Sequence, residues 1–261
     1  MDNDSLERRT VQDVGRVYFD GDKNYPSVTT VLGVEEEPEG LRKWKSKHKG
    51  NDKRHWKDIM EYKGYRGTLL HYELLNQLSD EELYGENERD AEENLEEGNV
   101  WERTDFEVEE DPIERTEEGI EWAKDVWEEI KENRGITDEN ILNVETFVVN
   151  EDLEYAGQFD LLYIDNDGDV VLSDIKTSSG IYDKHRLQTI AYNNAIDIDV
   201  DKLEIIRIHP DSKKYEISHD YMWSKSRDDF FKKLIYLRAL AKKKMSEQEL
   251  QEIADEGVDD G

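Results

Sequence analysis

Six polar residues between positions 145 and 192 have the side chains that metal-assisted chemistry needs, and they interrupt otherwise apolar segments. They are Glu145, Asp160, Asp174, Lys176, Gln188 and Tyr192. Asp160 lies in YAGQFDLLYI and Asp174 in VVLSDIKT, and the turn sequence DNDGD separates these segments. The pattern predicts two neighbouring strands joined by a hairpin. Carboxylates on adjacent strands can hold a divalent cation between them.

The position of each residue in the Asp-Ile-Lys triplet at 174–176 predicts a different role for it. Residues two apart in a strand point to the same side, so Asp174 and Lys176 share a face. The carboxylate can ligate Mg²⁺ or Mn²⁺, and the ammonium can orient or deprotonate an attacking water. The Ile175 side chain then anchors the strand in the core, while its backbone carbonyl can supply a further oxygen to the metal.

The segment DKHRLQTIAYNNA, which follows this strand, predicts an amphipathic helix. Gln188 and Tyr192 are four residues apart and share a helical face with His185. Apolar residues fill much of the remaining surface of the helix. We therefore expect one face of this helix to pack and the other to touch a substrate.

Taken in order, these motifs resemble the RecB-like branch of the PD-(D/E)xK nuclease superfamily. GTLLH at 67–71 resembles the family's G-x-x-x-H helix, and Glu145 resembles the acidic residue on its first core strand. GQFD, DIKT and QTIAY resemble the acidic motif, the D/E-x-K triplet and the Q-x-x-x-Y motif that follow. YPSVTTVLG at 25–33 resembles an N-terminal segment common in these nucleases, so the matches run from about 25 to 192.

The resemblance implies an α/β fold, with a restriction-endonuclease-like core in which helices flank a central mixed β-sheet. It also implies metal ligands that bind one or two Mg²⁺ or Mn²⁺ ions, namely His71, Asp160, Asp174 and the carbonyl of Ile175. The implied catalytic residues, which include the lysine that positions water or stabilises charge, are Lys176, Asp174, Asp160, Glu145, Gln188 and Tyr192. The implied activity is hydrolysis of DNA, as an exonuclease in recombination, repair or viral genome processing.

The composition is extreme, with 66 Asp and Glu against 35 Lys and Arg and a formal net charge of −31. Such a surplus destabilises the compact state unless salt screens it, and at molar salt the Debye length is only about 3 Å. We therefore expect a cytoplasmic protein of a halophilic archaeon, or of a host cell infected by its virus. The alternative is an inactive nuclease scaffold that binds DNA, or an acidic protein that mimics DNA.

A basic segment at 41–57, LRKWKSKHKGNDKRHWK, stands apart from this acidic background. Its cationic and aromatic residues are Arg42, Lys43, Trp44, Lys45, Lys47, Lys49, Lys53, Arg54, Trp56 and Lys57. Interleaved cations and tryptophans predict a surface that tracks phosphates and stacks on bases, with DNA as the partner. The other interpretation is a solvated helix pair whose tryptophans belong to the core.

The chain contains no cysteine, which excludes disulfides and the iron–sulfur cluster that several RecB-like relatives carry. Its mean hydropathy of −0.96 gives no support to a membrane segment. A second copy of the chain and a recombination protein remain open as partners. The turn DNDGD lacks the glycine placement and distal glutamate of an EF-hand, so it predicts a hairpin turn rather than a calcium site.

The organisation predicted from periodicity is an N-terminal arm at 1–24, a nuclease domain at 25–245 and an acidic tail at 246–261. The segment RVYFDGDKNY, which begins in the arm, predicts a hairpin. An acidic insertion at about 80–116 interrupts the domain. Strands are expected at 142–150, 154–165 and 169–176, followed by the strands KLEIIRIHP and YEISH. A final helix is expected to open at Ser226 and to end near three lysines at 242–244, which suit the helix dipole or touch DNA.

Overall fold

The structure is a computed structural model, and it describes residues 7–11, 14–20, 23–49, 55–79, 89, 91 and 112–256. The predicted acidic insertion at about 80–116 falls mostly outside these residues. Lys53 and Arg54 of the basic segment also lie outside them.

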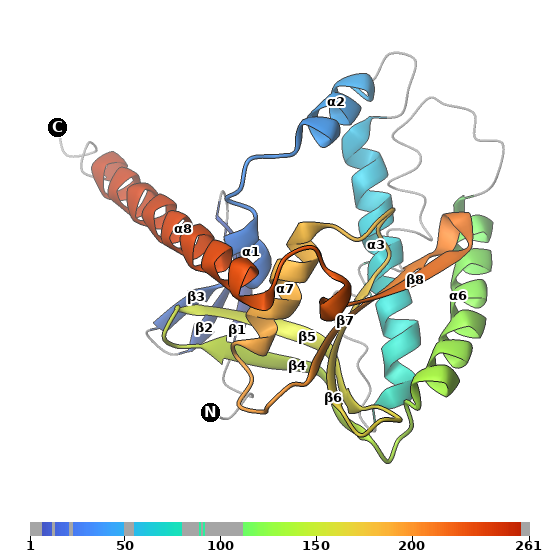
Figure 1. Ribbon diagram of the computed structural model, residues 1–261. Coiled ribbons are helices and arrows are strands. Elements are labelled where there is room, and N and C mark those ends of the chain that lie inside the picture. Colours follow the sequence, from blue (N-terminus) through green and yellow to red (C-terminus); the bar gives the residue numbers. More distant parts are fainter. Residues whose placement is uncertain are drawn as a thin grey trace.

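A five-stranded mixed sheet lies at the centre of the molecule (Figure 1). Its strands, in spatial order, are β4 (Ile141–Asn150), β5 (Tyr155–Ile164), β6 (Val170–Lys176), β7 (Lys202–His209) and β8 (Lys214–His219). β6 and β7 are parallel, and the other neighbouring pairs are antiparallel. The middle strands are buried on both faces, which explains why their sequences are nearly continuous apolar runs.

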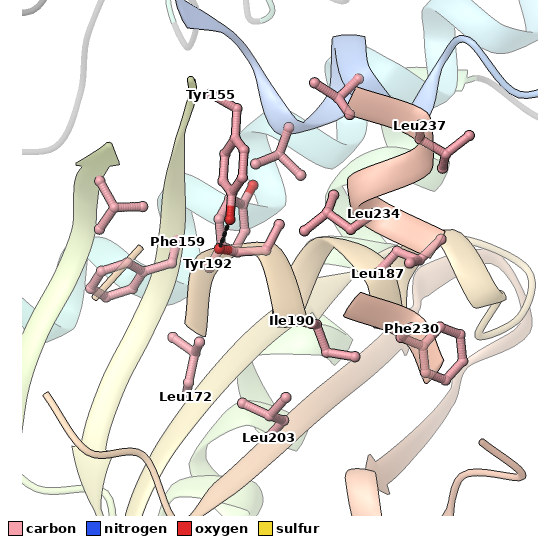
Figure 2. Close-up of a cluster of buried hydrophobic side chains, with 14 of the residues drawn as sticks. Tyr155, Phe159, Leu172, Leu187, Ile190, Tyr192, Leu203, Phe230, Leu234 and Leu237 are labelled. Carbon is pink, nitrogen blue, oxygen red and sulfur yellow. Dashed lines mark hydrogen bonds between the residues drawn. The ribbon is translucent and has the colours of Figure 1, made fainter. Parts of the chain in front are cut away.

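Helices cover both faces of the sheet (Figure 1). One face carries α1 (Val28–Leu32), α7 (Asp183–Asn193) and α8 (Arg227–Glu256), and the other carries α3 (Trp56–Leu75) and α6 (Pro112–Arg134). Neighbouring residues of one strand therefore enter different cores, as Leu161 and Leu162 of β5 do. Figure 2 shows the first core, in which α7 packs between the sheet and α8. The predicted α/β fold with a central mixed sheet and flanking helices is confirmed.

The crossover from β6 to β7 positions the end of β6. Parallel neighbours cannot be joined by a tight turn, so the chain leaves β6 after Lys176, forms α7 across one face and returns as β7. The triplet Asp174–Lys176 consequently lies at the carboxyl end of a buried strand. This end of a strand next to a crossover is where α/β proteins commonly build their sites.

The predicted N-terminal arm is a small antiparallel sheet rather than a loose segment. It consists of β1 (Glu7–Val11), β2 (Gly15–Asp20) and β3 (Lys23–Pro26). The hairpin expected within this region is confirmed, with Asp20 opposite Lys23. Tyr18 and Tyr25 are buried against Ala156 of β5, so this sheet packs on the central one.

The final helix is longer than its sequence pattern predicts. Ser226 caps its first turn, since the Asp229 amide donates to the Ser226 Oγ at 3.3 Å. The apolar stripe of α8 is buried against α1 and α7, as Figure 2 shows in part; it consists of Phe230, Leu234, Leu237 and Ala241. The helix continues to Glu256 and projects from the body (Figure 1), so Lys242 to Lys244 lie in its middle rather than at its end. The helix-dipole interpretation of these lysines is therefore wrong.

The remaining described elements are the helix α2 (Glu39–Lys47) and 3₁₀ turns at Asn76–Leu78, Pro210–Ser212 and Asp220–Met222. α2 lies beside the start of α3, where Trp56 donates from its amide to the His48 carbonyl at 2.8 Å. Among the described residues, no helix is both long enough and apolar enough to span a bilayer.

Candidate metal centre

Three metal-ligating side chains from distant parts of the chain meet at one point. His71 comes from α3, Glu145 from β4 and Asp160 from β5. Each offers one ligand atom, and these atoms all lie within 4.8 Å of one another. The His71 Nδ1 is 3.8 Å from the Asp160 Oδ2, a separation that leaves room for an ion between imidazole and carboxylate.

Glu145 reaches this point through an irregular backbone. Val144 pairs with Leu161 and Thr146 with Phe159, which places Glu145 opposite Asp160 in the ladder. Its φ of 43° lies in the left-handed region, which costs a residue other than glycine about 1 kcal/mol. The Gln158 side chain donates to the Glu145 carbonyl at 3.0 Å and thereby supports this conformation. Strain of this kind is concentrated at functional sites.

Asp174 and Lys176 lie beside these residues and contact each other. The Lys176 Nζ donates to the Asp174 Oδ1 at 2.8 Å, and the Asp174 residue is only 1% exposed. The same Nζ lies 2.7 Å from the Oδ2, so the ammonium contacts both oxygens of this buried carboxylate. Carboxylate oxygens are also the ligands that a hard divalent cation prefers.

Ile175 joins the two acidic strands. Its amide donates to the Asp160 Oδ2 at 2.6 Å, and its side chain is buried in the core on the α3 and α6 face, as predicted. The N–H and C=O groups of one strand residue point to the same edge. The Ile175 carbonyl therefore faces the side on which Asp160 lies, and its role as a ligand stays a prediction.

Burial is the largest influence on the electrostatics of this cluster. Burial raises the pKa of the Asp160 carboxyl, and burial also raises the pKa of Asp174 to about 6, although Lys176 opposes both shifts. Burial acts to lower the pKa of Lys176, but Asp174 and Asp160 raise it more, so its net pKa lies above the usual value. Burial thus disfavours the charged forms of Asp160 and Asp174 more than Lys176 favours them, and a divalent cation would stabilise those charged forms.

The donor set fits a hard divalent cation. Two or three carboxylates with one imidazole suit Mg²⁺ or Mn²⁺, which prefer oxygen ligands and retain waters. The structure brings His71, Glu145 and Asp160 into the tightest group. Asp174 lies next to it, since both Asp160 and His71 influence the pKa of Asp174.

Gln188 and Tyr192 form a pair on the side of α7 that packs against the site. The Gln188 Nε2 donates to the Tyr192 hydroxyl at 2.7 Å, and Tyr192 belongs to the core around α7 (Figure 2). Burial, with Asp174 as the next cause, raises the Tyr192 pKa well above its usual value, so its hydroxyl stays protonated. A Cβ at Gly157 would collide with the Tyr192 ring, so the glycine of GQFD lets this ring approach β5.

His185, which was predicted to share a helical face with Gln188 and Tyr192, is buried like Tyr192 and helps to close the start of α7. Its side chain is buried, and its Nδ1 accepts a hydrogen bond from the Tyr182 amide at 3.3 Å, which closes the first turn of α7. Burial, followed by the charge of Lys176, lowers the pKa of His185 to about 3. His185 is therefore a neutral part of the helix start.

The basic segment forms an exposed surface at α2 and the start of α3. No residue of α2 is buried, and Trp44 and Trp56 are half-buried, which contradicts the interpretation of these tryptophans as core residues. The Lys45 Nζ lies 4.2 Å from the centre of the Trp56 ring and also pairs with Glu37. Lys43 pairs with Glu39 at 2.7 Å.

Part of this surface keeps its charge available. Arg42, Lys47 and Lys49 are exposed and form no ion pair within the described part of the chain. The surface therefore offers cations and aromatic rings, although two of its lysines are already neutralised by glutamates.

Sequence reasoning missed Tyr18 and Arg16, which lie in the predicted arm. Burial raises the pKa of Tyr18, while Arg16 and Arg8 lower it and Glu145 raises it further. Tyr18 of the N-terminal sheet therefore lies near Glu145 of the candidate metal centre, and Arg16 and Arg8 lie near Tyr18. The only sequence signal was the hairpin pattern RVYFDGDKNY, which does not say where the hairpin packs.

A second acidic group, Asp165, Asp167 and Asp169, lies in the β5–β6 turn. The Lys202 Nζ reaches all three carboxylates, at 2.7, 3.5 and 2.7 Å respectively. The Asp165 Oδ1 accepts hydrogen bonds from two backbone amides of the turn, and Gly168 supplies a φ of 86°. The predicted hairpin turn is confirmed, and one lysine pairs with all three of its acids.

Comparisons with known proteins add little. No protein-family profile and no curated protein matches the chain. The crystal structure of the protein SSO0001 is similar at 15% sequence identity, over 66% of this chain and 82% of that one, with a TM-score of 0.32. This similarity is too low to support any statement about function.

Proposed function

We propose that the protein is a divalent-metal-dependent DNA nuclease of the RecB-like branch of the PD-(D/E)xK superfamily, and that it acts as an exonuclease. The observation that supports this most is the convergence of His71, Glu145 and Asp160 beside the Asp174–Lys176 pair. These residues were selected from sequence motifs alone, and α3 lies more than sixty residues before β4. A chance set of acidic and basic residues would have no reason to meet.

A bound Mg²⁺ or Mn²⁺ would polarise the scissile phosphate and lower the pKa of a bound water. His71, Glu145, Asp160 and Asp174 would hold the ion, with the Ile175 carbonyl as a further oxygen donor. Asp160 and Asp174 are buried, which makes their charges more effective than they would be at the surface.

Lys176 acts as a charged donor in this proposal. Its raised pKa keeps the ammonium protonated, so it orients the attacking water and stabilises the negative charge that develops on the phosphate. The Tyr192 hydroxyl and Gln188 form a fixed hydrogen-bonding pair that positions the strand near the scissile bond. DNA approaches over the exposed basic and aromatic surface at α2 and the start of α3.

The surplus of acid places this nuclease in a high-salt cytoplasm, that of a halophilic archaeon or of a cell infected by its virus. Salt weakens phosphate contacts, so stacking on Trp44 and Trp56 and bridging through the metal carry more of the affinity there. Recombination, repair and viral genome processing are the pathways that such an exonuclease serves. An inactive DNA-binding scaffold or DNA mimic would have no need for the buried Asp174–Lys176 pair.

The test is a digestion in molar KCl of linear and circular DNA, single- and double-stranded, with Mg²⁺, with Mn²⁺ and with EDTA. We expect metal-dependent degradation of linear DNA and survival of the circles. Degradation of circles would replace the exonuclease by an endonuclease. Absence of cleavage in every reaction by a folded protein, judged by circular dichroism, would favour the binding-protein alternative.

A further inference from the structure

A second positively charged feature lies away from the metal centre, in a groove between α8 and the N-terminal sheet. The groove has a volume of about 410 Å³ and is bordered by β3, by the β4–β5 turn and by α8 (Figure 1). Its charged side chains are Lys23, Glu151, Glu154, Arg238 and Lys242. Asn24 and Ser246 add neutral polar groups to its lining.

Arg238 is the buried floor of this groove, and it has an unused donor. Its side chain is 9% exposed, and its Nε donates to the carbonyls of Leu153 and Glu154 at 2.8 and 2.9 Å. These bonds fix the guanidinium in one orientation. The Nη1 is buried without a hydrogen-bond partner in the described structure. A buried N–H group of a charged side chain that lacks an acceptor is expensive, and it leaves the charge of Arg238 only partly compensated beneath the groove.

The charge of this groove is unusual for the chain. The groove under β4 contains Glu151, Asp152 and Asp197 and no Lys or Arg, and the groove between α3 and α6 contains four acids and one lysine. The α8 groove contains three cations and two acids. The net charge of the whole protein is −31, so a groove with more cations than acids differs in sign from the rest of the protein.

The two acids of the groove act mainly as supports. The Glu154 carboxylate pairs with Lys242 and lies 3.5 Å from the Arg238 Nη2, so it holds both cations at the wall. Glu151 lies 3.8 Å from the Lys23 Nζ at the opposite rim. The Nζ groups of Lys23 and Lys242, whose side chains are 62% and 63% exposed, remain for a ligand.

We propose that this groove binds a phosphate group. A rigid guanidinium with flanking ammonium and amide groups is the combination that recognises phosphate oxygens. Tyr25 lines the groove and pairs with Tyr18 across the N-terminal sheet, and Tyr18 lies near Glu145 of the candidate metal centre. Glu145 and Asn150 are five positions apart on β4, a separation of about 17 Å, which is the length of about five stacked nucleotides.

The source of the phosphate is either the backbone of a DNA strand or free phosphate. The groove can bind a phosphate group whether or not the protein is a nuclease. The further claim, that this phosphate belongs to a DNA strand that reaches the candidate metal centre, rests on the proposed function. The two sources can be separated experimentally, because a strand and a free ion are different probes.

The experiment compares the wild type with Lys242→Glu and Asn24→Asp, which place negative charge in the groove at exposed positions. Lys244→Glu is the matched control, since it makes the same charge change on the same helix outside the groove lining. Arg238 itself is left intact because its bonds to the β4–β5 turn support the fold. The first arm measures the fluorescence anisotropy of a labelled single strand in EDTA. The second measures the unfolding temperature with inorganic phosphate against chloride of equal ionic strength.

If the ligand is a strand, Lys242→Glu weakens DNA binding about fivefold and Lys244→Glu less than twofold. If it is free phosphate, phosphate raises the unfolding temperature of the wild type and Lys244→Glu but not of the two groove variants. Equal behaviour of Lys242→Glu, Asn24→Asp and Lys244→Glu in both arms would overturn the proposal. If the wild type binds in this way but never cleaves DNA, the proposed nuclease function would be wrong and the proposed phosphate site would still hold.

Discussion

Two groups of acidic residues in this protein behave in opposite ways, although the acids of the β5–β6 turn lie between Asp160 and Asp174 in sequence. At the β5–β6 turn, hydrogen bonds from Lys202 and from backbone amides hold the pKa of Asp165 below its usual value, although burial opposes them. At the metal centre, burial outweighs Lys176 and raises the pKa values of Asp160 and Asp174. The two groups differ because hydrogen bonds outweigh burial at Asp165, whereas burial outweighs them at Asp160 and Asp174.

The largest expected difference between the two groups is in catalysis. Asp174→Ala and Lys176→Ala should each lower DNA cleavage about 10³-fold or more, because each removes a charge that acts on the reacting phosphate. Asp167→Ala, whose side chain is 82% exposed at the turn, should retain cleavage within about twofold. Initial rates on linear DNA, with circular dichroism as a check of folding, decide the comparison. Cleavage by Asp174→Ala at the wild-type rate would refute the assignment.

A glycine-to-alanine substitution should destabilise the protein more near the candidate metal centre than at the β5–β6 turn. Gly157→Ala forces a Cβ into the Tyr192 ring beside the metal centre, and overpacking of this kind costs about 2 to 3 kcal/mol. Gly168→Ala at the turn meets no neighbour, but its φ of 86° makes an alanine cost about 1 kcal/mol. Urea unfolding in molar KCl measures both variants. The reverse order would mean that Tyr192 does not pack against β5 as described.

The two regions also predict opposite dependences of stability on pH in the metal-free protein. Burial raises the folded-state pKa of Asp174 from 3.8 to about 6, so the folded state keeps a proton that the unfolded chain has released. The contribution of Asp174 to the free energy of unfolding is therefore full below about pH 4 and is lost as the pH rises to about 6. Asp165 has a lowered pKa, so its contribution is lost as the pH falls through that value.

Unfolding temperatures of the wild type, Asp174→Asn and Asp165→Asn between pH 4 and pH 7 in EDTA measure this contrast. The unfolding temperature of Asp174→Asn should decrease less between about pH 4 and 6 than that of the wild type. Asp165→Asn should keep that fall. Parallel curves for the wild type and Asp174→Asn would contradict the raised pKa.

Much of the central sheet was predictable because its hydrophobic pattern is strong. Strands expected at 142–150, 154–165 and 169–176 are found at Ile141–Asn150, Tyr155–Ile164 and Val170–Lys176. Buried strands of a mixed sheet have nearly continuous apolar sequences, so their few polar residues stand out. Asp160 and Asp174 were identified for that reason.

Features that depend on tertiary packing were not predictable in the same way. Periodicity does not say that the hairpin of Tyr18 packs beside Glu145, nor that Lys202 reaches into an acidic turn more than thirty residues earlier. The burial of His185 follows from its hydrogen bond to the start of α7, which a helical-face argument does not include. His71 was selected only through a family resemblance, since a single histidine on a helix carries no signal of its own.

Anomalous diffraction at the manganese absorption edge, from crystals grown with Mn²⁺ in high salt, tests the central claim most directly. The account predicts a peak within about 2.3 Å of ligand atoms of His71, Glu145 and Asp160, close to Asp174, and no peak at the turn of Asp165. A peak at that turn, or a folded protein in Mn²⁺ with no peak at the centre, would contradict it.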